Sequence, residues 1–439
     1  MASAGDRILM LLENNPFPQD GRVRREANTL AAAGYRVSVV APRGPGQPWR
    51  ERVGEVEVYR FPAPPDANGF LGYLYEYVYS MTAALLLSLF VFLRRGFDVI
   101  HAHNPPDTFA FVAALFKPFG VRFVFDHHDL SPEMYYARFS GKGNRLVHRA
   151  LVLFEQFTCK LADHVIATNQ SYRAVEMGRG GVPEGRITVV RNGPELDRVR
   201  TVSPDPALRA RGETIIGFVG DMGYHDGVDY LLRSLKHLVC DLGRTDFFCV
   251  IIGRGAAWAG LRALAARLEL DPYVWFTGWV SSADLRRYLS TADICVDPDP
   301  SNPFTDRSTM IKMTEYMAFG KPIVAFDLTE HRVTARDAAV YARPNDELDF
   351  ARQIARLMDD PEKRREMGQV GRRRVEAELA WPHQERRLLA AYETLMKRAG
   401  ASASAPPLKL LKSEVTGTAA DQGAGQMERK ALWVSENRS

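Results

Sequence analysis

Short apolar runs alternate with longer amphipathic segments along most of the chain. Each run ends near Gly, Pro, Asn or His and is followed by apolar residues at helical spacing, which is typical of a parallel α/β sheet. The first series of predicted strands covers residues 7–12, 37–41, 56–61, 99–101, 122–126, 164–168 and 187–190. After a polar stretch near residue 200, a second series covers 214–220, 247–253, 274–278, 294–297 and 322–326. The pattern predicts two Rossmann-like, doubly wound α/β domains.

The restart of the pattern sets the expected domain boundaries. We expect an N-terminal domain over 1–200 and a C-terminal domain over 201–382. A final helix over 383–399 and a disordered tail over 400–439 follow, because the tail is rich in small residues and lacks periodicity. Ligands of open α/β sheets bind beyond the carboxyl ends of the strands. Two such domains facing each other across a cleft are therefore expected to share one site.

One uncharged segment, residues 77–93, is unusually apolar and is followed by Arg94 and Arg95. Its length is near the lower limit of about 17 residues for a membrane-spanning helix. The favoured interpretation is a mostly buried helix, and the second is a helix lying on a membrane surface over Phe70–Leu93. A true span is the least favoured, because the strand-like FDVIHAH follows at once.

Charge and cysteine content exclude several classes of protein. The chain has 439 residues and a formal net charge of +4, which lacks the excess expected of a nucleic-acid binder. The four cysteines have neither C-x-x-C spacing nor the density of a disulfide framework. The first residues carry no basic region ahead of a long apolar run. These features predict a cytoplasmic protein with no nucleic-acid partner.

The segment DRSTMIKMTEYMAFGKPIVAF, from Asp306, suggests a loop, a helix and a buried strand. Ser308 or Thr309 is expected to cap the helix, whose free amides favour a phosphate. Lys312 adds a positive charge in the first turn, and Glu315 lies on the same face, where a carboxylate can bind both hydroxyls of a ribose. A solvated helix face gives the same spacing, so both interpretations stay open.

This segment resembles the E-x7-E region of glycosyltransferase family 4, a retaining family with the GT-B fold of two Rossmann-like domains. Glu315 matches the second glutamate, and AFGKPIVA is the usual continuation. VRNGPE, FVGDMGYHDGVDYLLRSL, VIIGRG and VWFTGWVSSADLRRYLSTADICVDP resemble other family segments in the family's order. In the N-terminal half, HAHNPPD and FDHHDLSPEMYYARF resemble acceptor-side motifs of members that build bacterial surface polysaccharides.

The resemblance implies roles for individual residues. Predicted catalytic residues are His128, Lys312 and Glu315. Predicted donor-binding residues are Gly21, Gly220, Arg254, Arg307, Ser308, Thr309, Met310, Ile311, Lys312 and Glu315. Predicted acceptor-side residues are His103, Asn104, Asp107, His127, Asp129 and Glu133.

Three positions depart from the family pattern. Arg307 stands where the family usually has its first glutamate, and Asp221 and Asp226 stand where it carries an arginine and a lysine toward the donor diphosphate. Two carboxylates facing a diphosphate repel it, so other cations are needed. Arg307, Lys312 and Arg254 are the candidates.

Two patterns resemble metal sites, but neither predicts one. His101, His103, His127, His128, Asp126 and Asp129 come from neighbouring strand ends, yet histidines beside a diphosphate can simply donate hydrogen bonds. The D-P-D of VDPDPSNP is more typical of a rigid loop, because proline separates the two aspartates. We therefore expect no metal and no cofactor other than the donor substrate.

The predicted activity is that of a retaining glycosyltransferase, which moves a sugar from a nucleotide-diphosphate-sugar donor to a glycan or lipid-linked acceptor. The resemblance places this reaction in polysaccharide or cell-envelope biosynthesis, in the cytoplasm or at the inner face of the cell membrane. Two alternatives remain: a nucleotide-sugar 2-epimerase of the same fold, and a non-catalytic nucleotide-sugar-binding partner. The non-catalytic alternative is suggested by the absence of the family's usual arginine, lysine and first glutamate.

Overall fold

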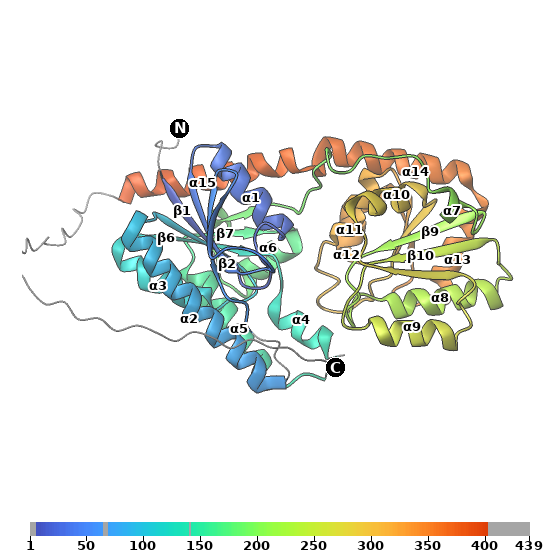
Figure 1. Ribbon diagram of the computed structural model, residues 1–439, viewed down its shortest axis with the longest axis horizontal. Helices are drawn as coiled ribbons and strands as arrows, with labels where there is room; N and C mark the ends of the chain where they lie inside the picture. The colour runs from blue at the N-terminus through green and yellow to red at the C-terminus, as the bar shows by residue number, and fades with distance from the viewer. Residues whose placement is uncertain (1–5, 65–68, 140–141, 403–439) are drawn as a thin grey trace, which may run out of the picture. The chain divides into compact units, whose positions relative to one another are not determined.

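The computed structural model describes residues 6–64, 69–139 and 142–402, and it contains two parallel sheets with helices on their faces (Figure 1). Each sheet is formed by its own half of the chain. The predicted fold class of two doubly wound α/β domains is confirmed.

The N-terminal sheet has the strand order β3-β4-β2-β1-β5-β6-β7-β8. All of its neighbouring pairs are parallel except β3 and β4, which form an antiparallel edge. Its strands are β1 (Arg7–Leu11), β2 (Arg36–Pro42), β3 (Arg50–Val53), β4 (Val56–Phe61), β5 (Val99–His103), β6 (Arg122–His127), β7 (His164–Ala167) and β8 (Ile187–Val189). The helices of this half are α1 (Gly21–Ala32), α2 (Gly69–Arg95), α3 (Phe109–Phe116), α4 (Ser131–Arg138), α5 (Arg145–Leu161) and α6 (Gln170–Gly178), with short 3₁₀ turns η1 (Lys117–Phe119) and η2 (Glu184–Arg186).

The C-terminal sheet is wholly parallel and has the order β11-β10-β9-β12-β13-β14. Its strands are β9 (Thr214–Val219), β10 (Phe247–Ile252), β11 (Val274–Gly278), β12 (Ile294–Asp297), β13 (Ile323–Phe326) and β14 (Ala339–Ala342). The helices of this half are α7 (Pro206–Arg209), α8 (Val228–Cys240), α9 (Trp258–Arg267), α10 (Ser282–Thr291), α11 (Ile311–Ala318), α12 (Thr329–Ala335), α13 (Glu347–Asp359) and α14 (Pro361–Arg374), with a 3₁₀ turn η3 (Arg336–Ala338) and a π-helical turn η4 (Val375–Leu379).

The last helix, α15 (Trp381–Ser402), packs into the core of the N-terminal domain. Leu388 and Leu395 are buried among residues of β1, β2 and α1. The Trp381 indole N–H donates to Thr29 Oγ1 at 3.1 Å, and Tyr392 Oη lies 2.9 Å from His101 Nδ1. The chain thus returns to its first domain after completing the second. The predicted disordered tail lies outside the described residues from position 403 onward.

Helix α2 packs only one side against the sheet. Ser80, Ala84, Ser88 and Val91 form its buried stripe, whereas Leu93 is 76% exposed. In an 18-residue apolar window within Tyr75–Arg95, only 22% of the residues are buried, so the interpretation as a mostly buried helix is wrong. By length and composition this is also the one described helix that can cross a membrane.

Candidate functional site

The loops after β5 and β6 are tied together by one amide side chain. Asn104 Oδ1 accepts the backbone N–H of His128 at 2.8 Å and that of Asp129 at 3.1 Å. Asn104 Nδ2 donates to Asp107 Oδ1 at 2.9 Å and to the Asp129 carbonyl at 2.6 Å. Four predicted acceptor-side or catalytic residues are therefore brought together at the carboxyl edge of the sheet. Asn104 holds the other three in place through its own hydrogen bonds.

His128 lies above a buried ion pair. Its Nδ1 is 3.7 Å from Asp126 Oδ1, and its side chain is 13% exposed. Arg22 donates to both oxygens of Asp126, at 2.7 and 2.8 Å, and His103 Nδ1 lies 2.9 Å from Asp126 Oδ2. Burial disfavours the protonated form of His128, but the Asp126 carboxylate outweighs it and raises the pKa of His128. His103, by contrast, has a lowered pKa because it is fully buried.

Two other predicted acceptor-side residues are committed to a buried ionic network. His127 Nδ1 is 3.2 Å from Glu176 Oε1, and its Nε2 is 3.7 Å from Glu155 Oε2. Burial opposes protonation of His127, yet the two glutamates raise its pKa to about 9. Glu133 pairs with both outer nitrogens of Arg179 at 2.6 and 2.9 Å. These contacts direct His127 and Glu133 toward the protein interior, and their acceptor-side roles stay predictions.

In the C-terminal domain, glycines bring three strand-end loops into contact. Gly253 after β10 has φ +125°, and a Cβ there would lie 1.9 Å from the Gly220 carbonyl oxygen after β9. Gly227 has φ +67°, and a Cβ there would lie 2.0 Å from the Pro298 carbonyl oxygen after β12. Both positions therefore require glycine. The predicted Gly21 carries no such demand, because its Cβ would meet only Arg25 Nη1, at 3.4 Å.

Lys312 is less free than its sequence position suggests. Its Nζ lies 2.9 Å from Asp299 Oδ1 and 3.3 Å from Asp297 Oδ1, and its side chain is 10% exposed. Burial disfavours the charged ammonium, but the two aspartates outweigh this and raise the pKa of Lys312. The lysine thus balances the carboxylates at the end of β12.

Glu315 stands apart from these paired groups. It is partly buried on α11, and no hydrogen bond or ion pair engages its carboxylate anywhere in the described ranges. Burial raises the pKa of Glu315, and the charge of Arg25 on α1 acts in the opposite direction. An acceptor group without a partner in a partly buried position is available to a ligand. This placement agrees with the predicted contact to a ribose.

The start of α11 differs from the prediction. The helix begins at Ile311, its N-cap residue is Met310, and no side chain caps it, so the expected cap by Ser308 or Thr309 is wrong. Ser308 Oγ instead donates to the Phe304 carbonyl at 2.8 Å and lies 3.0 Å from Tyr172 Oη. The Ser308 hydroxyl therefore lies in the preceding loop, and among the described residues no side chain caps the first amides of the helix. Those amides remain open to a ligand.

Several side chains that the sequence did not single out link the two halves of the chain beside this loop. Asn169 Nδ2 donates to the Arg307 carbonyl at 2.8 Å and to Thr309 Oγ1 at 2.9 Å. Arg191 donates to Thr334 Oγ1 at 2.8 Å. The strand-end position of each was the available signal, since Asn169 follows β7 and Arg191 follows β8.

Two predicted cations remain largely unneutralised. Arg254 is exposed, and its contact is with the Trp258 ring, 5.7 Å from the centroid. The Arg307 side chain is 43% exposed, donates to the Pro303 carbonyl at 2.8 Å and lies 3.9 Å from Glu133 Oε1. Ile311 is 45% exposed at the helix start. Arg254 and Arg307 are thus available to an anionic ligand, whereas Asp226 accepts the Gly223 N–H at 2.7 Å and shapes its own loop.

Two buried clusters have the composition of cation sites. One contains Glu26, His101, His103 and Asp126, and the other contains Asp297, Asp299 and His331. In the first, Arg22 already pairs with Asp126 at 2.7 Å and lies 3.2 Å from Glu26. In the second, Lys312 supplies the positive charge. Each cluster therefore holds an internal cation.

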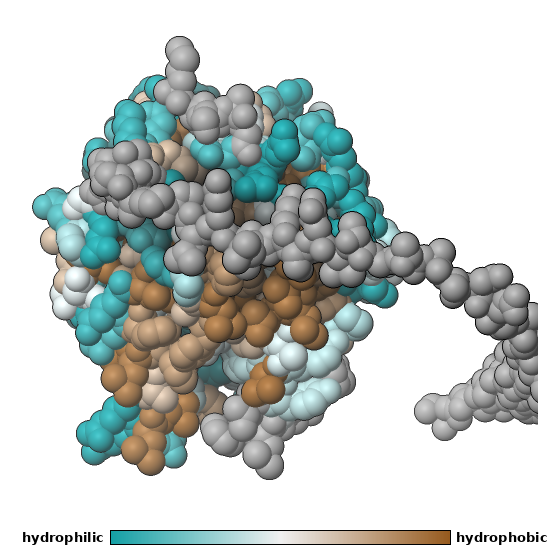
Figure 2. All heavy atoms as spheres, turned by 90° about the vertical axis from the view of Figure 1, so that its left-hand side faces the viewer, coloured by the Kyte–Doolittle hydropathy of each residue, from teal (hydrophilic) through white to brown (hydrophobic). Residues whose placement is uncertain are grey.

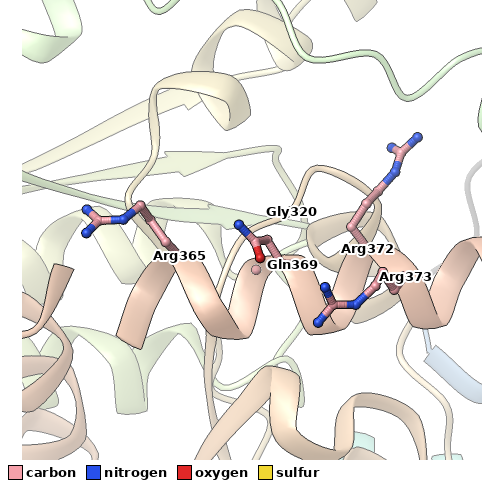
Figure 3. A pocket seen from close by; sticks show the side chains of 6 residues that line it. Gly320, Arg365, Gln369, Arg372 and Arg373 are labelled. Atoms are coloured by element: carbon pink, nitrogen blue, oxygen red, sulfur yellow. The ribbon is translucent and has the colours of Figure 1, made fainter. Parts of the chain in front are cut away.

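A cavity of about 410 Å³ lies elsewhere, between Gly320 and helix α14. It is lined by Gly320, Arg365, Gly368, Gln369, Arg372 and Arg373. The three arginines point in different directions from α14 (Figure 3). Gly320 follows the carboxyl end of α11, whereas Lys312 lies in its first turn, so this cavity is separate from the strand-end site.

Comparison with known proteins decides the family. The profile of the "Glycosyl transferase 4-like domain" matches residues 21–193, and that of "Glycosyl transferases group 1" matches residues 213–360. The chain belongs to the family 4 type of glycosyltransferases. A 2-deoxystreptamine glucosyltransferase of Streptomyces kanamyceticus is 23% identical over 392 residues, covering 85% of this chain and 98% of that protein.

Solved structures confirm the GT-B fold of this glycosyltransferase. A sucrose-phosphate synthase from Thermosynechococcus elongatus superposes with a TM-score of 0.73 at 20% identity, covering 90% of this chain and 100% of that one. Anabaena HepE in complex with UDP-glucose gives a TM-score of 0.64 at 15% identity, covering 90% and 99%. The comparisons favour neither the epimerase nor the non-catalytic alternative.

Proposed function

We propose that this glycosyltransferase is a retaining enzyme, which moves a sugar from a nucleotide-diphosphate-sugar donor to a glycan or lipid-linked acceptor. The reaction belongs to polysaccharide or cell-envelope biosynthesis in the cytoplasm, with attachment to the membrane surface through residues 70–93. Retention follows from the family resemblance.

The observation that carries the proposal is the unpartnered carboxylate of Glu315 on α11. It matches the family glutamate and sits where a ribose is expected, three residues after Lys312. Two charge-assisted hydrogen bonds from ribose hydroxyls would satisfy both of its oxygens. HepE, a protein of the same fold, has been solved with UDP-glucose, which supports a nucleotide sugar as the donor.

The diphosphate needs positive charge as it leaves. The uncapped amides of α11, together with Arg254 and Arg307, supply it in this proposal, and Lys312 lies in the first turn of the same helix although it pairs with Asp297 and Asp299. Asp221 is exposed after β9 and is expected to turn toward solvent. Catalysis then rests on charge stabilisation by side chains and amides, and no metal is required.

On the acceptor side, His128 is the group expected near the transferring sugar. Asn104 fixes its backbone, and Asp126 favours the protonated ring, which can donate hydrogen bonds to sugar or phosphate oxygens. His103, Asp107 and Asp129 support this loop. In this proposal, the acceptor binds at a sheet edge whose loops are held in place by hydrogen bonds.

A donor panel tests the proposal. Purified protein is incubated with UDP-, GDP-, ADP- and dTDP-sugars, with and without a membrane lipid extract, and nucleotide release is measured. We expect one donor class to release nucleotide when the extract is present, and the product to keep the anomeric configuration of the donor by NMR. Binding without turnover supports the non-catalytic alternative, and isomerised donor without acceptor supports the epimerase.

A further inference from the structure

Three neighbouring helices of the N-terminal domain expose apolar side chains on a common face, which we call the α2–α3–α5 face. Figure 2 shows apolar residues gathered on this side of the molecule. Its residues, all exposed, are Leu86, Leu89, Leu93, Phe111, Leu115, Phe119, Leu146, Leu153 and Phe157. The helices touch through aromatic rings: those of Phe111 and Phe157 are stacked with centroids 5.2 Å apart, and those of Phe92 and Phe119 are tilted with centroids 5.6 Å apart.

Helix α5 is the clearest example of the unusual exposure of large apolar side chains on this face. A surface helix usually turns its apolar side inward. Here Leu146 is 71% exposed and Leu153 is 63% exposed, while Glu155 and Thr158 point inward. Glu155 is buried because it pairs with Arg179 at 2.7 Å. Part of the apolar side of α5 therefore faces outward, and large exposed apolar patches mark interaction sites.

The charges around the face indicate what covers it. Within α2, α3, η1 and α5, the cations are Arg94, Arg95, Lys117, Arg145, Arg149 and Lys160. Arg95 pairs with Glu57 and Lys117 with Asp163, and the other four form no ion pair within the described residues. These helices contain two acidic residues. Glu155 is buried, and Glu76 is partly exposed. An apolar face with a basic rim matches an anionic lipid surface.

We infer that the α2–α3–α5 face docks on an anionic bilayer surface. This inference rests on the proposed function, which attaches the protein to the membrane through residues 70–93. It adds α3 and α5 to that membrane-binding surface. Docking is interfacial, because Ser80, Ala84, Ser88 and Val91 hold α2 against the domain core. The Ser80 hydroxyl donates to Glu13 Oε1 at 3.1 Å, two residues after β1 ends. The N-terminal part of α2 therefore lies beside the end of β1, in the domain where a lipid-linked acceptor is expected.

Vesicle flotation of the full chain tests the inference. We expect wild type to float with phosphatidylglycerol-containing vesicles and to float much less with phosphatidylcholine alone. Leu146→Asp combined with Leu153→Asp reduces binding at least tenfold, whereas Val202→Asp, at an exposed linker position outside the face, does not. Arg145→Glu combined with Arg149→Glu removes the preference for anionic vesicles, with a loss of about fivefold or more per residue.

Two measurements keep the outcome decisive. Thermal melting of each variant is expected to match wild type, because the substituted side chains are exposed. Light scattering distinguishes a second copy of the chain as the occupant. The inference is overturned if wild type stays at the bottom of the gradient with anionic vesicles, or if it forms a dimer that the leucine variants dissociate. Nucleotide release with soluble acceptors is measured separately, so loss of vesicle binding and loss of transferase activity are distinguishable.

Discussion

The charged side chains at the carboxyl edges of the two sheets differ in whether the protein itself provides their partners. In the N-terminal domain, Asp126, His127 and Glu133 are each held by a partner from the protein itself, at distances from 2.6 to 3.2 Å. In the C-terminal domain, Glu315 has no partner among the described residues, and Arg254 contacts only a tryptophan ring. These charged groups of the first edge are paired within the protein, whereas Glu315 and Arg254 at the second edge are left open.

This difference suggests that the N-terminal edge positions groups and that the C-terminal edge binds the ligand. A buried network that satisfies itself fixes the backbone and side chains around it but offers little to a ligand. Charged groups that have no partner in the protein need hydrogen bonds from water or from a bound ligand. We therefore expect changes in the N-terminal network to act mainly on stability and alignment, and changes at α11 to act mainly on donor binding. Lys312 is the exception, because it is paired and also lies at the open edge.

The largest effect is expected from Lys312→Ala. Removing the ammonium leaves the buried Asp297 and Asp299 with only His331, 3.6 Å from Asp297, beside them, which costs about 3–5 kcal/mol of unfolding free energy. It also weakens stabilisation of the leaving diphosphate, so kcat falls about 100-fold and more than KM rises. Arg307→Ala is milder in both respects, because its side chain is 43% exposed. Melting curves and steady-state kinetics measure the two effects.

A second substitution separates charge balance from catalysis at Lys312. Adding Asp297→Asn to Lys312→Ala is expected to recover stability but not kcat. Recovery of both would show that the lysine serves only to balance the aspartates. Asp226→Lys is expected to restore part of kcat, because it returns a cation beside the same loop, although it removes the hydrogen bond to the Gly223 N–H.

The closed network of the N-terminal edge predicts a pH dependence of stability. The pKa of His127 is raised to about 9 from a usual value near 6.5, so its charge stabilises the fold fully below pH 6.5. The contribution, about 3 kcal/mol, is lost as the pH rises from 6.5 through 9. Chemical denaturation across this range measures it. Glu176→Gln is expected to flatten the dependence.

Asn104→Ala tests alignment at the same edge. The substitution removes the acceptor for the backbone N–H groups of His128 and Asp129, which costs about 1–2 kcal/mol of stability. We expect kcat to fall roughly tenfold with little change in donor affinity, because the donor is proposed to bind at the other domain. A change in donor affinity as large as that in kcat would mean that the two edges are not functionally separate.

The smallest effect is expected from chelation. Both buried clusters that resemble metal sites contain an internal cation, Arg22 in one and Lys312 in the other. Turnover is therefore expected to be unchanged in EDTA. Loss of activity that magnesium or manganese restores would assign a metal to Asp297 and Asp299 instead.

The sequence was informative where local pattern determines structure. Alternating apolar runs predicted both sheets, because each buried strand needs an apolar run of its own. Glu315 was identified from its position in a recognisable segment, and the structure leaves its carboxylate open. Gly253 and Gly227 were not identified, because their requirement comes from contacts with carbonyl oxygens of distant loops.

Pairing across the fold was the part that the sequence did not reveal. Ser308 looked like a helix cap, but its hydroxyl lies in the preceding loop, where it donates to the Phe304 carbonyl. Lys312 looked like a free cation because Asp297 and Asp299 lie more than ten residues away in sequence. The exposed side of α5 was missed as well, because apolar periodicity does not tell whether a helix faces the core or the surface.

Calorimetric titration of the nucleotide diphosphate into wild type and Glu315→Ala tests the central claim most directly. We expect Glu315→Ala to weaken nucleotide binding by about 10- to 100-fold, which corresponds to about 1.5–3 kcal/mol for hydrogen bonds to a charged group. Its melting temperature is expected to match wild type, because the carboxylate has no partner in the described chain. Glu269→Ala, at an exposed glutamate that pairs with Lys236, serves as the matched control. Unchanged nucleotide affinity in Glu315→Ala would contradict the account and place Glu315 on a solvated helix face.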